Sequence, residues 1–372
     1  MPWRAVSTEA LRQEFLTLNA QGAVSFRELC RRFGISRKTG YKWRARAAAG
    51  AALTDRARRP QRSPRRTGPA VEAAVVGLRH AHPAWGARKL RRRLQDQGAA
   101  VPAASTLTRI LHRHGLIAAA AAGPRAWQRF EHPVPNALWQ MDFKGAVPTL
   151  AGPAHPLTVL DDHSRFNLCL RVLPDQQTAG VQGALTATFR TYGLPDRLLV
   201  DNGSPWGSDA AHPWTPLTVW CLRVGVGVSH SRPYHPQTLG KEERFHETLD
   251  VEVLTGTQWR DRAHLQGRLD RWRPVYNLER PHEALGLAVP ASRYRPSLRP
   301  FPETLPPIAY APGVPVRKVQ QGGHFTFQGR ACKVGKAFAG YPVALRPTLT
   351  DGVYEVVFCA HVVAELNFTT GP

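Results

Sequence analysis

The sequence predicts a multidomain protein with a helical front, an α/β middle and a β-rich tail. Apolar residues recur at helical spacing up to residue 117, short β-prone runs flank one helix after residue 136, and glycine-separated β-prone runs return after residue 315. The length of 372 residues allows about two to four domains of about 100 to 200 residues each.

Charge divides the chain in the same way. It carries 50 Lys and Arg against 27 Asp and Glu, a formal net charge of +23. Residues 1–130 hold 26 basic and 6 acidic residues, residues 131–300 hold 18 and 17, and residues 301–372 hold 6 and 4. Such a front predicts binding to a polyanion, although ribosomal and chromatin proteins share this composition. The near-neutral middle, which contains most of the carboxylates, indicates chemistry that uses acids.

Composition also bears on the compartment. The five cysteines are scattered and form no C-x-x-C pair, which disfavours a disulfide framework and a thiolate zinc site and favours a reducing cytosol. The start of the chain lacks an apolar run of signal-peptide length, and nowhere is there an uncharged apolar run of roughly 18 residues. We therefore expect a cytoplasmic, nucleoid-associated protein of bacterial type that is not secreted and does not span a membrane.

The first three predicted helices form a helix-turn-helix. Ser25 and Glu28 make a capping box at the start of an amphipathic helix, Ser36 caps a short basic helix over 37–44, and a helix over about 8–19 precedes both. We expect the basic helix to enter the major groove; the alternative is a plain three-helix bundle with a solvated basic face. The DNA contacts predicted here are Arg37, Lys38, Lys42 and Arg44.

A basic linker and a second trihelical unit follow. Residues 54–68 contain two prolines and six arginines and have no apolar period, so we expect an extended arm that neutralises phosphates or follows a minor groove. Helices over about 69–80, 85–94 and 105–115 form the second unit, although any helical bundle would show the same leucine spacing. Further predicted DNA contacts are Arg58, Arg59, Arg65 and Arg66 in the arm, and Arg88, Lys89 and Arg109 in the second unit.

From residue 136 the pattern predicts an α/β sheet. The β-prone runs cover 139–143, 157–160, 167–172 and 197–201. A helix over about 178–192 precedes the fourth run. Asp142 lies in the first run and Asp201 ends the fourth, so the two carboxylates meet at one edge of the sheet if those strands are neighbours. A helix over 241–249 can bring a third carboxylate over that edge.

Three acids at the end of a sheet, without cysteine or paired histidine, predict a site for hard divalent cations. Mg²⁺ and Mn²⁺ take oxygen ligands and leave open positions for substrate phosphate and water. Two such ions can activate a water or sugar hydroxyl and stabilise the leaving oxygen in an in-line phosphoryl displacement. The predicted chemistry is DNA strand cutting and joining.

Three motifs stand in this segment: WQMDFKG at 139–145, VDNG at 200–203, and YHPQT at 234–238 followed by GKEERFH at 240–246. Together they resemble the DDE integrase catalytic core of insertion-sequence transposases related to retroviral integrases. RPHEAL at 280–285 resembles the end of that core, and the paired helix-turn-helix front resembles theirs. The resemblance implies a ribonuclease-H-like fold, two Mg²⁺ or Mn²⁺ ions per active site, and Asp142, Asp201 and Glu243 as the catalytic and metal-binding acids.

Two other glutamates are alternatives for the third acid. A gap of 41 residues separates Glu243 from the second acid, more than in retroviral integrases, and Glu242 stands where the pattern has a small or apolar residue. On a helix, Glu242 leans toward the stripe formed by Phe245 and Leu249, whereas Glu243 points away from it. We therefore choose Glu243, with Glu242 and Glu247 as the alternatives.

Other polar residues have two interpretations each. The DDHS run at 161–164 could be a metal cluster, but acids and serine between two strands favour a hairpin turn. His235 and Lys241 flank the start of the third-acid helix, where the resemblance makes them phosphate or DNA-end contacts; the alternative is a capped helix entry. Arg280 and His282 either touch DNA or tie down the last helix of the core.

The tail predicts a small β barrel. After a proline-rich stretch, six short β-like runs separated by glycine turns extend to the end of the chain. Domains of this kind in transposases and integrases grip DNA or a second subunit, but the low charge of the tail favours a structural role equally well.

Together these features predict a transposase that binds the ends of a mobile DNA element and cleaves and transfers DNA strands. Because two ends must be brought together, we expect a homo-oligomer on DNA. A nuclease of the same fold and a DNA-binding regulator derived from a transposase are the alternatives. The expected parts are a first helix-turn-helix domain at 1–53, a basic linker at 54–68, a second helix-turn-helix domain at 69–117, a linker at 118–135, the ribonuclease-H-like core at 136–295, a proline-rich linker at 296–315 and the barrel at 316–372.

Overall fold

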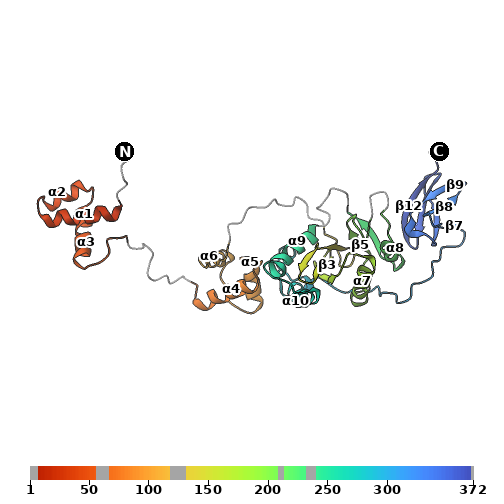
Figure 1. The fold of residues 1–372 in the computed structure, drawn as a ribbon, viewed down its shortest axis with the longest axis horizontal. Coiled ribbons are helices and arrows are strands. Elements are labelled where there is room, and N and C mark those ends of the chain that lie inside the picture. The colour runs from red at the N-terminus through yellow and green to blue at the C-terminus, as the bar shows by residue number, and fades with distance from the viewer. Residues whose placement is uncertain (1–6, 56–66, 118–130, 208–212, 232–239, 370–372) are drawn as a thin grey trace. The chain divides into compact units, whose positions relative to one another are not determined.

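A computed structural model describes residues 7–55, 67–117, 131–207, 213–231 and 240–369. The chain divides into two compact units, residues 1–66 and residues 67–372, and each is described by itself. Figure 1 labels the helices and strands along the chain. In the described part, no helix is both long and apolar enough to cross a membrane.

The first unit contains three helices. They are α1 (Thr8–Gln21), α2 (Phe26–Arg32) and α3 (Arg37–Ala48). The Ser36 side chain caps α3 by accepting a hydrogen bond from Thr39 N at 3.2 Å, and Ser25 accepts one from Glu28 N at 3.3 Å. The predicted capping box is half formed, because the Glu28 carboxylate pairs with Arg31 along the helix instead.

The second unit begins with another three helices. They are α4 (Pro69–Ala81), α5 (Ala87–Asp96) and α6 (Ala104–Arg113). One apolar residue from each helix, Val75, Leu90 and Leu107, is fully buried beside Trp85. The partly buried Val275, which belongs to the middle segment, packs against the same cluster.

A mixed sheet forms the centre of the middle segment. Its strands are β1 (Trp139–Phe143), β2 (Val147–Thr149), β3 (Gly152–Asp161), β4 (Asn167–Leu173), β5 (Arg197–Val200) and β6 (Gly227–His230). The long β3 pairs antiparallel with β1, β2 and β4, while β1, β5 and β6 run parallel. The sequence did not predict β2 or β6.

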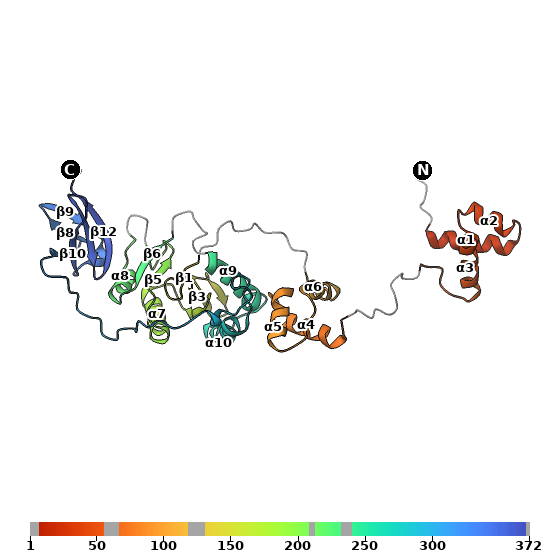
Figure 2. The ribbon, with the colours of Figure 1, turned by 180° about the vertical axis from the view of Figure 1, so that it is seen from behind.

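Helices cover both faces of this sheet. They are α7 (Thr178–Tyr192), α8 (Pro216–Arg223), α9 (Gly240–Leu249) and α10 (Arg262–Pro274), with π-helical turns η2 (Asp250–Leu254) and η3 (Val275–Glu279) and short 3₁₀ turns η4 (Glu283–Leu285) and η5 (Pro290–Ser292). Trp139 and Met141 of β1 share a core with α7 and α8, whereas Leu160 of β3 lies in a core with α9 and α10. Side chains alternate along a strand, so Gln140 and Asp142 lie on the α9 face. Figure 2 shows β1, β3 and α9 from behind.

The tail corrects the predicted barrel. Its strands are β7 (Val316–Lys318), β8 (His324–Phe327), β9 (Arg330–Lys333), β10 (Pro342–Pro347), β11 (Val353–Phe358) and β12 (His361–Asn367), with the 3₁₀ turn η6 (Lys336–Phe338). They form a four-stranded sheet in the order β12-β11-β10-β7 and a separate β8-β9 hairpin, so the described strands do not close into a barrel. The two sheets share an apolar core, to which Val219 and Leu222 of α8 also belong, and Arg317 Nε of β7 donates to Thr326 O of β8 at 3.2 Å.

Candidate active site

The first two predicted acids lie at the same end of a parallel strand pair. β1 and β5 are neighbours, and Gln140 is opposite Leu199 in their register. Asp142 and Asp201 each follow two residues later, so both stand at the carboxyl ends of adjacent strands. The condition on which the sequence placed the two carboxylates together is therefore met.

Asp142 is half-buried, and the negative charges of the other two predicted acids act on it. Burial raises its pKa to about 6, and the negative charges of Asp201 and Glu243 raise the pKa in the same direction. The backbone N–H of Phe143 donates to Asp142 Oδ1 at 2.8 Å and opposes the rise. The negative charges of both other predicted acids thus act on Asp142.

Asp201 is oriented by donors from its own loop. Gly203 N donates to Asp201 Oδ1 at 2.9 Å, and the indole N–H of Trp206 donates to the same oxygen. A Cβ at position 203 would lie 3.2 Å from Asp201 Oδ2, so glycine lets this turn approach the carboxylate closely. Asn202 extends the network by donating from Nδ2 to Ser231 O at 3.0 Å.

The structure separates the three candidates for the third acid. Glu243 is exposed, and its charge acts on Asp142. Glu242 is fully buried, and Thr158 Oγ1 lies 2.9 Å from its Oε2; burial raises the pKa of Glu242 well above its usual range, with Asp142 adding to the rise. Glu247 is exposed and pairs with Arg244 at 2.7 Å. Helix geometry thus places Glu242 and Glu243 on the sides that the sequence predicted.

A buried polar cluster stands behind Asp142 that the sequence did not predict. Thr158 is opposite Asp142 in the β1–β3 register, and its Oγ1 donates to the Asp142 backbone carbonyl at 3.0 Å. His246 Nε2 lies 2.8 Å from the same hydroxyl, and His246 Nδ1 lies 4.0 Å from Asp142 Oδ2. Burial lowers the pKa of His246 to about 3, so the ring is neutral. The available signal was the spacing of Glu242 and His246, four residues apart on one helix.

The acids fit a divalent cation in their chemistry. Within the described ranges, no three His, Cys, Asp or Glu side chains are gathered closely enough to enclose an ion. Asp142, Asp201 and Glu243 nevertheless offer only hard oxygen donors, and their mutual repulsion at Asp142 is the strain that a cation relieves.

The predicted DNA contacts have unequal surroundings. All four on α3 and also Arg88 and Arg109 are exposed. Lys89 on α5 is partly buried, and burial together with the charge of Arg280 lowers its pKa to about 8. The arm residues Arg58, Arg59, Arg65 and Arg66, and also His235, lie outside the described residues.

Lys241, Arg280 and the DDHS run have structural partners. Lys241 pairs with the buried carboxylate of Asp162. Arg280 is 4% exposed and donates to Glu252 at 3.3 Å and to Thr248 at 3.2 Å, which ties η3 to α9 and η2. The run from 161 forms the turn of the β3–β4 hairpin, as the sequence favoured.

His282 is also buried. Burial lowers its pKa to about 3, and its backbone N–H donates to Ala288 O at 3.0 Å. This backbone contact agrees with the structural interpretation of the residue.

Known proteins resemble the chain along most of its length. Family models match for a helix-turn-helix domain at 11–61, a homeodomain-like domain at 39–111, an integrase core domain at 132–236 and again at 224–290, and the C-terminal domain of IS481 family transposases at 314–371.

Individual relatives are more distant. The insertion element IS407 uncharacterized 31.7 kDa protein of Burkholderia multivorans is 27% identical over 159 residues, which is 42% of this chain and 54% of that protein. The insertion element IS476 uncharacterized 39.2 kDa protein of Xanthomonas euvesicatoria is 29% identical over 167 residues, 42% of this chain and 44% of that protein. The chain spans about half the length of these curated relatives. A simian T-cell lymphotropic virus intasome is 17% identical with a TM-score of 0.38, covering 79% of this chain and 99% of that chain, a likeness too loose to bear on the fold.

The sheet with its acids at one edge and the integrase core matches define a protein with a DDE-type integrase core. Two helix-turn-helix matches precede that core and an IS481-type domain follows it. The chain is therefore similar to insertion-sequence transposases in each of these segments, which confirms the resemblance in the motifs.

Proposed function

We propose that the chain is a transposase that binds the ends of a mobile DNA element, cleaves the DNA there and transfers the freed ends to a target. The observation that supports it most is the meeting of Asp142 and Asp201 at the ends of adjacent parallel strands, within reach of the charge of Glu243. The basic front, with exposed cations on α3, supplies the complementary surface for DNA phosphates.

The reaction is an in-line displacement at phosphorus. A water or a DNA hydroxyl attacks the phosphorus, and the bond from phosphorus to the leaving oxygen breaks. Two Mg²⁺ or Mn²⁺ ions, when bound, would activate the attacking oxygen and stabilise the leaving one. Asp142, Asp201 and Glu243 would hold them.

The surrounding residues orient these acids. Gly203 and Trp206 direct the Asp201 carboxylate through its Oδ1. Thr158 fixes the backbone of Asp142, and the neutral His246 of α9 lies 4.0 Å from Asp142 Oδ2 without adding a competing positive charge. Preorganised ligands of this kind spare the site reorganisation during the reaction.

The proposal extends to assembly and location. Joined transfer needs two element ends together, so the chain acts as a homo-oligomer on DNA, in the bacterial cytoplasm and at the nucleoid. The seven parts expected from the sequence, with a helix-turn-helix at each of 1–53 and 69–117 and the core at 136–295, are proposed as its functional divisions.

Nicking of supercoiled plasmid tests the proposal. We expect the purified chain to nick in Mg²⁺ or Mn²⁺ and to be inactive with a chelator. Asp201→Asn and Glu243→Gln should each abolish nicking, because each removes a metal ligand. Glu247→Gln is the matched control, since Glu247 is exposed on the same helix and pairs with Arg244. DNA binding without metal-dependent cutting would instead favour a regulator, and loss of nicking in Glu247→Gln with activity retained in Glu243→Gln would move the third acid.

A further inference from the structure

One buried carboxylate contacts the residues that lie two positions before each of two proposed catalytic acids. Asp162 is completely buried at the turn after β3. Its Oδ1 accepts a hydrogen bond from Gln140 Nε2 at 2.8 Å and pairs with Lys241 Nζ. Gln140 precedes Asp142 on β1, and Lys241 precedes Glu243 on α9.

The contact on the strand side fixes β1 where it approaches the site. Gln140 and Asp142 lie on the same face of the sheet, because they are two residues apart on one strand. Gln140 is 2% exposed, so its amide depends on partners within the protein. The Asp162 backbone N–H also donates to Leu138 O at 2.9 Å, which adds a second link to the start of β1.

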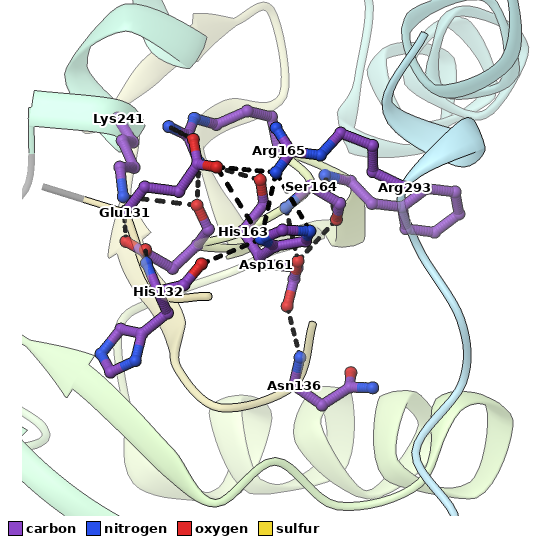
Figure 3. A network of polar contacts seen from close by, with 11 residues as sticks. Glu131, His132, Asn136, Asp161, His163, Ser164, Arg165, Lys241 and Arg293 are labelled. Atoms are coloured by element: carbon purple, nitrogen blue, oxygen red, sulfur yellow. Dashed lines mark hydrogen bonds and ion pairs between the residues drawn. The ribbon is translucent and has the colours of Figure 1, made fainter. Parts of the chain in front are cut away.

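The contact on the helix side fixes the first turn of α9. Lys241 is the second residue of this helix and Glu243 is the fourth. Lys241 Nζ also lies 3.3 Å from the Asp162 backbone carbonyl, and its side chain is 17% exposed. Figure 3 shows Lys241 within the same network as Arg165 and Asp161. Because these contacts hold the Lys241 ammonium in place, they tie the start of α9 to the hairpin turn.

We propose that Asp162 is a positioning residue that sets the distance between the strand acid Asp142 and the helix acid Glu243. This inference rests on the proposed function, since it concerns the same three acids. The other carboxylate oxygen, Oδ2, accepts from His132 N at 2.8 Å, so both oxygens are used. Replacing the carboxylate by an amide removes the negative charge that holds the Lys241 ammonium beside Gln140. Partners in this role outside the metal ligands typically contribute about 10- to 100-fold in metal affinity or activity.

The neighbouring Asp161 provides a matched control. It is also completely buried, but its carboxylate contacts Ser164 in the hairpin turn and Asn136 before β1. Its Oδ1 accepts from Ser164 N at 2.7 Å and its Oδ2 accepts from Asn136 N at 2.7 Å, as Figure 3 shows. Asp161→Asn therefore costs stability without touching Gln140 or Lys241.

The test uses the full chain and two readouts, Mn²⁺ binding without DNA followed by electron paramagnetic resonance, and plasmid nicking. We expect Asp162→Asn to raise the half-saturating Mn²⁺ concentration about tenfold and to lower kcat at least about tenfold, with DNA affinity unchanged. Lys241→Met should act alike, the double variant should be no worse than either single one, and Lys241→Arg should retain most activity. Asp161→Asn should lower the unfolding temperature while Mn²⁺ affinity and kcat stay near wild type.

Each outcome decides between the two proposals. Metal-dependent nicking by wild type with unchanged Mn²⁺ affinity and kcat in Asp162→Asn would overturn the positioning role and leave the transposase proposal standing. Weaker Mn²⁺ binding in Asp162→Asn, with no nicking by wild type, would support the positioning role and count against the reaction. Absence of both Mn²⁺ binding and nicking in wild type would overturn both.

Discussion

The two trihelical units are both rich in basic residues, but their basic side chains have different surroundings. On α3 of the first unit, the four predicted DNA contacts are all exposed, and Arg44 lies over the rings of Tyr41 and Phe26 at 4.9 and 5.2 Å. In the second trihelical unit, Lys89 on α5 is partly buried. The difference teaches that a basic segment does not expose all of its cations, so sequence alone overcounts the side chains that are open to a DNA phosphate.

The reason is that the second trihelical unit, helices α4 to α6, contacts the core. Trp85 Nε1 donates to Glu252 Oε1 at 3.0 Å, and Arg93 pairs with Glu279. Glu252 also accepts from Trp272 Nε1 at 2.7 Å and lies 3.3 Å from Arg280 Nε. The second trihelical unit therefore uses part of its polar surface to bind the core, whereas Arg37, Lys38, Lys42 and Arg44 of α3 are exposed.

Removal of the Glu252 carboxylate should have the largest effect on this contrast. Glu252→Ala leaves Trp85, Trp272 and the buried Arg280 without their shared acceptor. We therefore expect the free energy of unfolding of the compact unit of residues 67–372 to fall by about 3 kcal/mol or more. Denaturant unfolding of the full chain measures it. Glu28→Ala, which removes an exposed partner of Arg31 in the first unit, is the control and should cause no detectable change. Equal losses in both variants would contradict the contrast.

Loss of the α3 cap should have an intermediate effect confined to the first unit. Ser36→Ala removes the acceptor for Thr39 N, and we expect α3 to be destabilised by about 1 kcal/mol. Hydrogen exchange should show faster exchange in α3 and unchanged exchange in α6. Slower binding of DNA without any change in α3 exchange would show that the hydroxyl acts on DNA rather than on the helix.

The salt dependence of DNA binding sharpens the comparison further. Lys42→Ala should reduce the slope of log affinity against log salt by about 0.9, the value for one phosphate contact. Lys89→Met should leave the slope unchanged, because Lys89 is partly buried against the core. Fluorescence anisotropy with duplex DNA at several salt concentrations measures both. A reduced slope in Lys89→Met would restore that residue to the DNA-binding surface.

The pH dependence of stability gives a further test of the same contrast. The folded-state pKa of Lys89 is about 8, below that of an unfolded lysine, so the unfolded chain binds more protons between these values. The Lys89 contribution therefore disfavours folding below pH 8 and fades as the pH rises above it. Wild type should gain stability between about pH 8 and 10 relative to Lys89→Met. Parallel curves for the two proteins would show that the ammonium is solvated.

The sequence predicted most elements that have strong end signals. The helix expected over 178–192 is α7, because an apolar stripe ends there at Gly193. By contrast α10 was missed, since its buried Leu265, Leu269 and Trp272 stand among arginines that hide the stripe. The two short strands β2 and β6 were also missed, because runs of three or four residues have too little alternation to identify.

For the site, spacing placed the acids but not their supports. The register of β1 and β5 brings Asp142 and Asp201 together, which the order of motifs could suggest. The contact between Asp162 and Lys241 joins residues 79 positions apart, and no local pattern encodes it. The expected barrel failed for the same reason, because strand lengths and turns do not specify which strands pair at long range.

The carboxylate of Glu252 has an optical consequence. It receives the N–H groups of two indoles, Trp85 and Trp272, which are 0% and 4% exposed. If the second trihelical unit separated from the core, the Trp85 indole N–H would exchange this acceptor for water, and its emission would shift to longer wavelength. The difference spectrum between wild type and Trp85→Phe therefore makes intrinsic fluorescence a reporter of whether that unit is docked, without any added label.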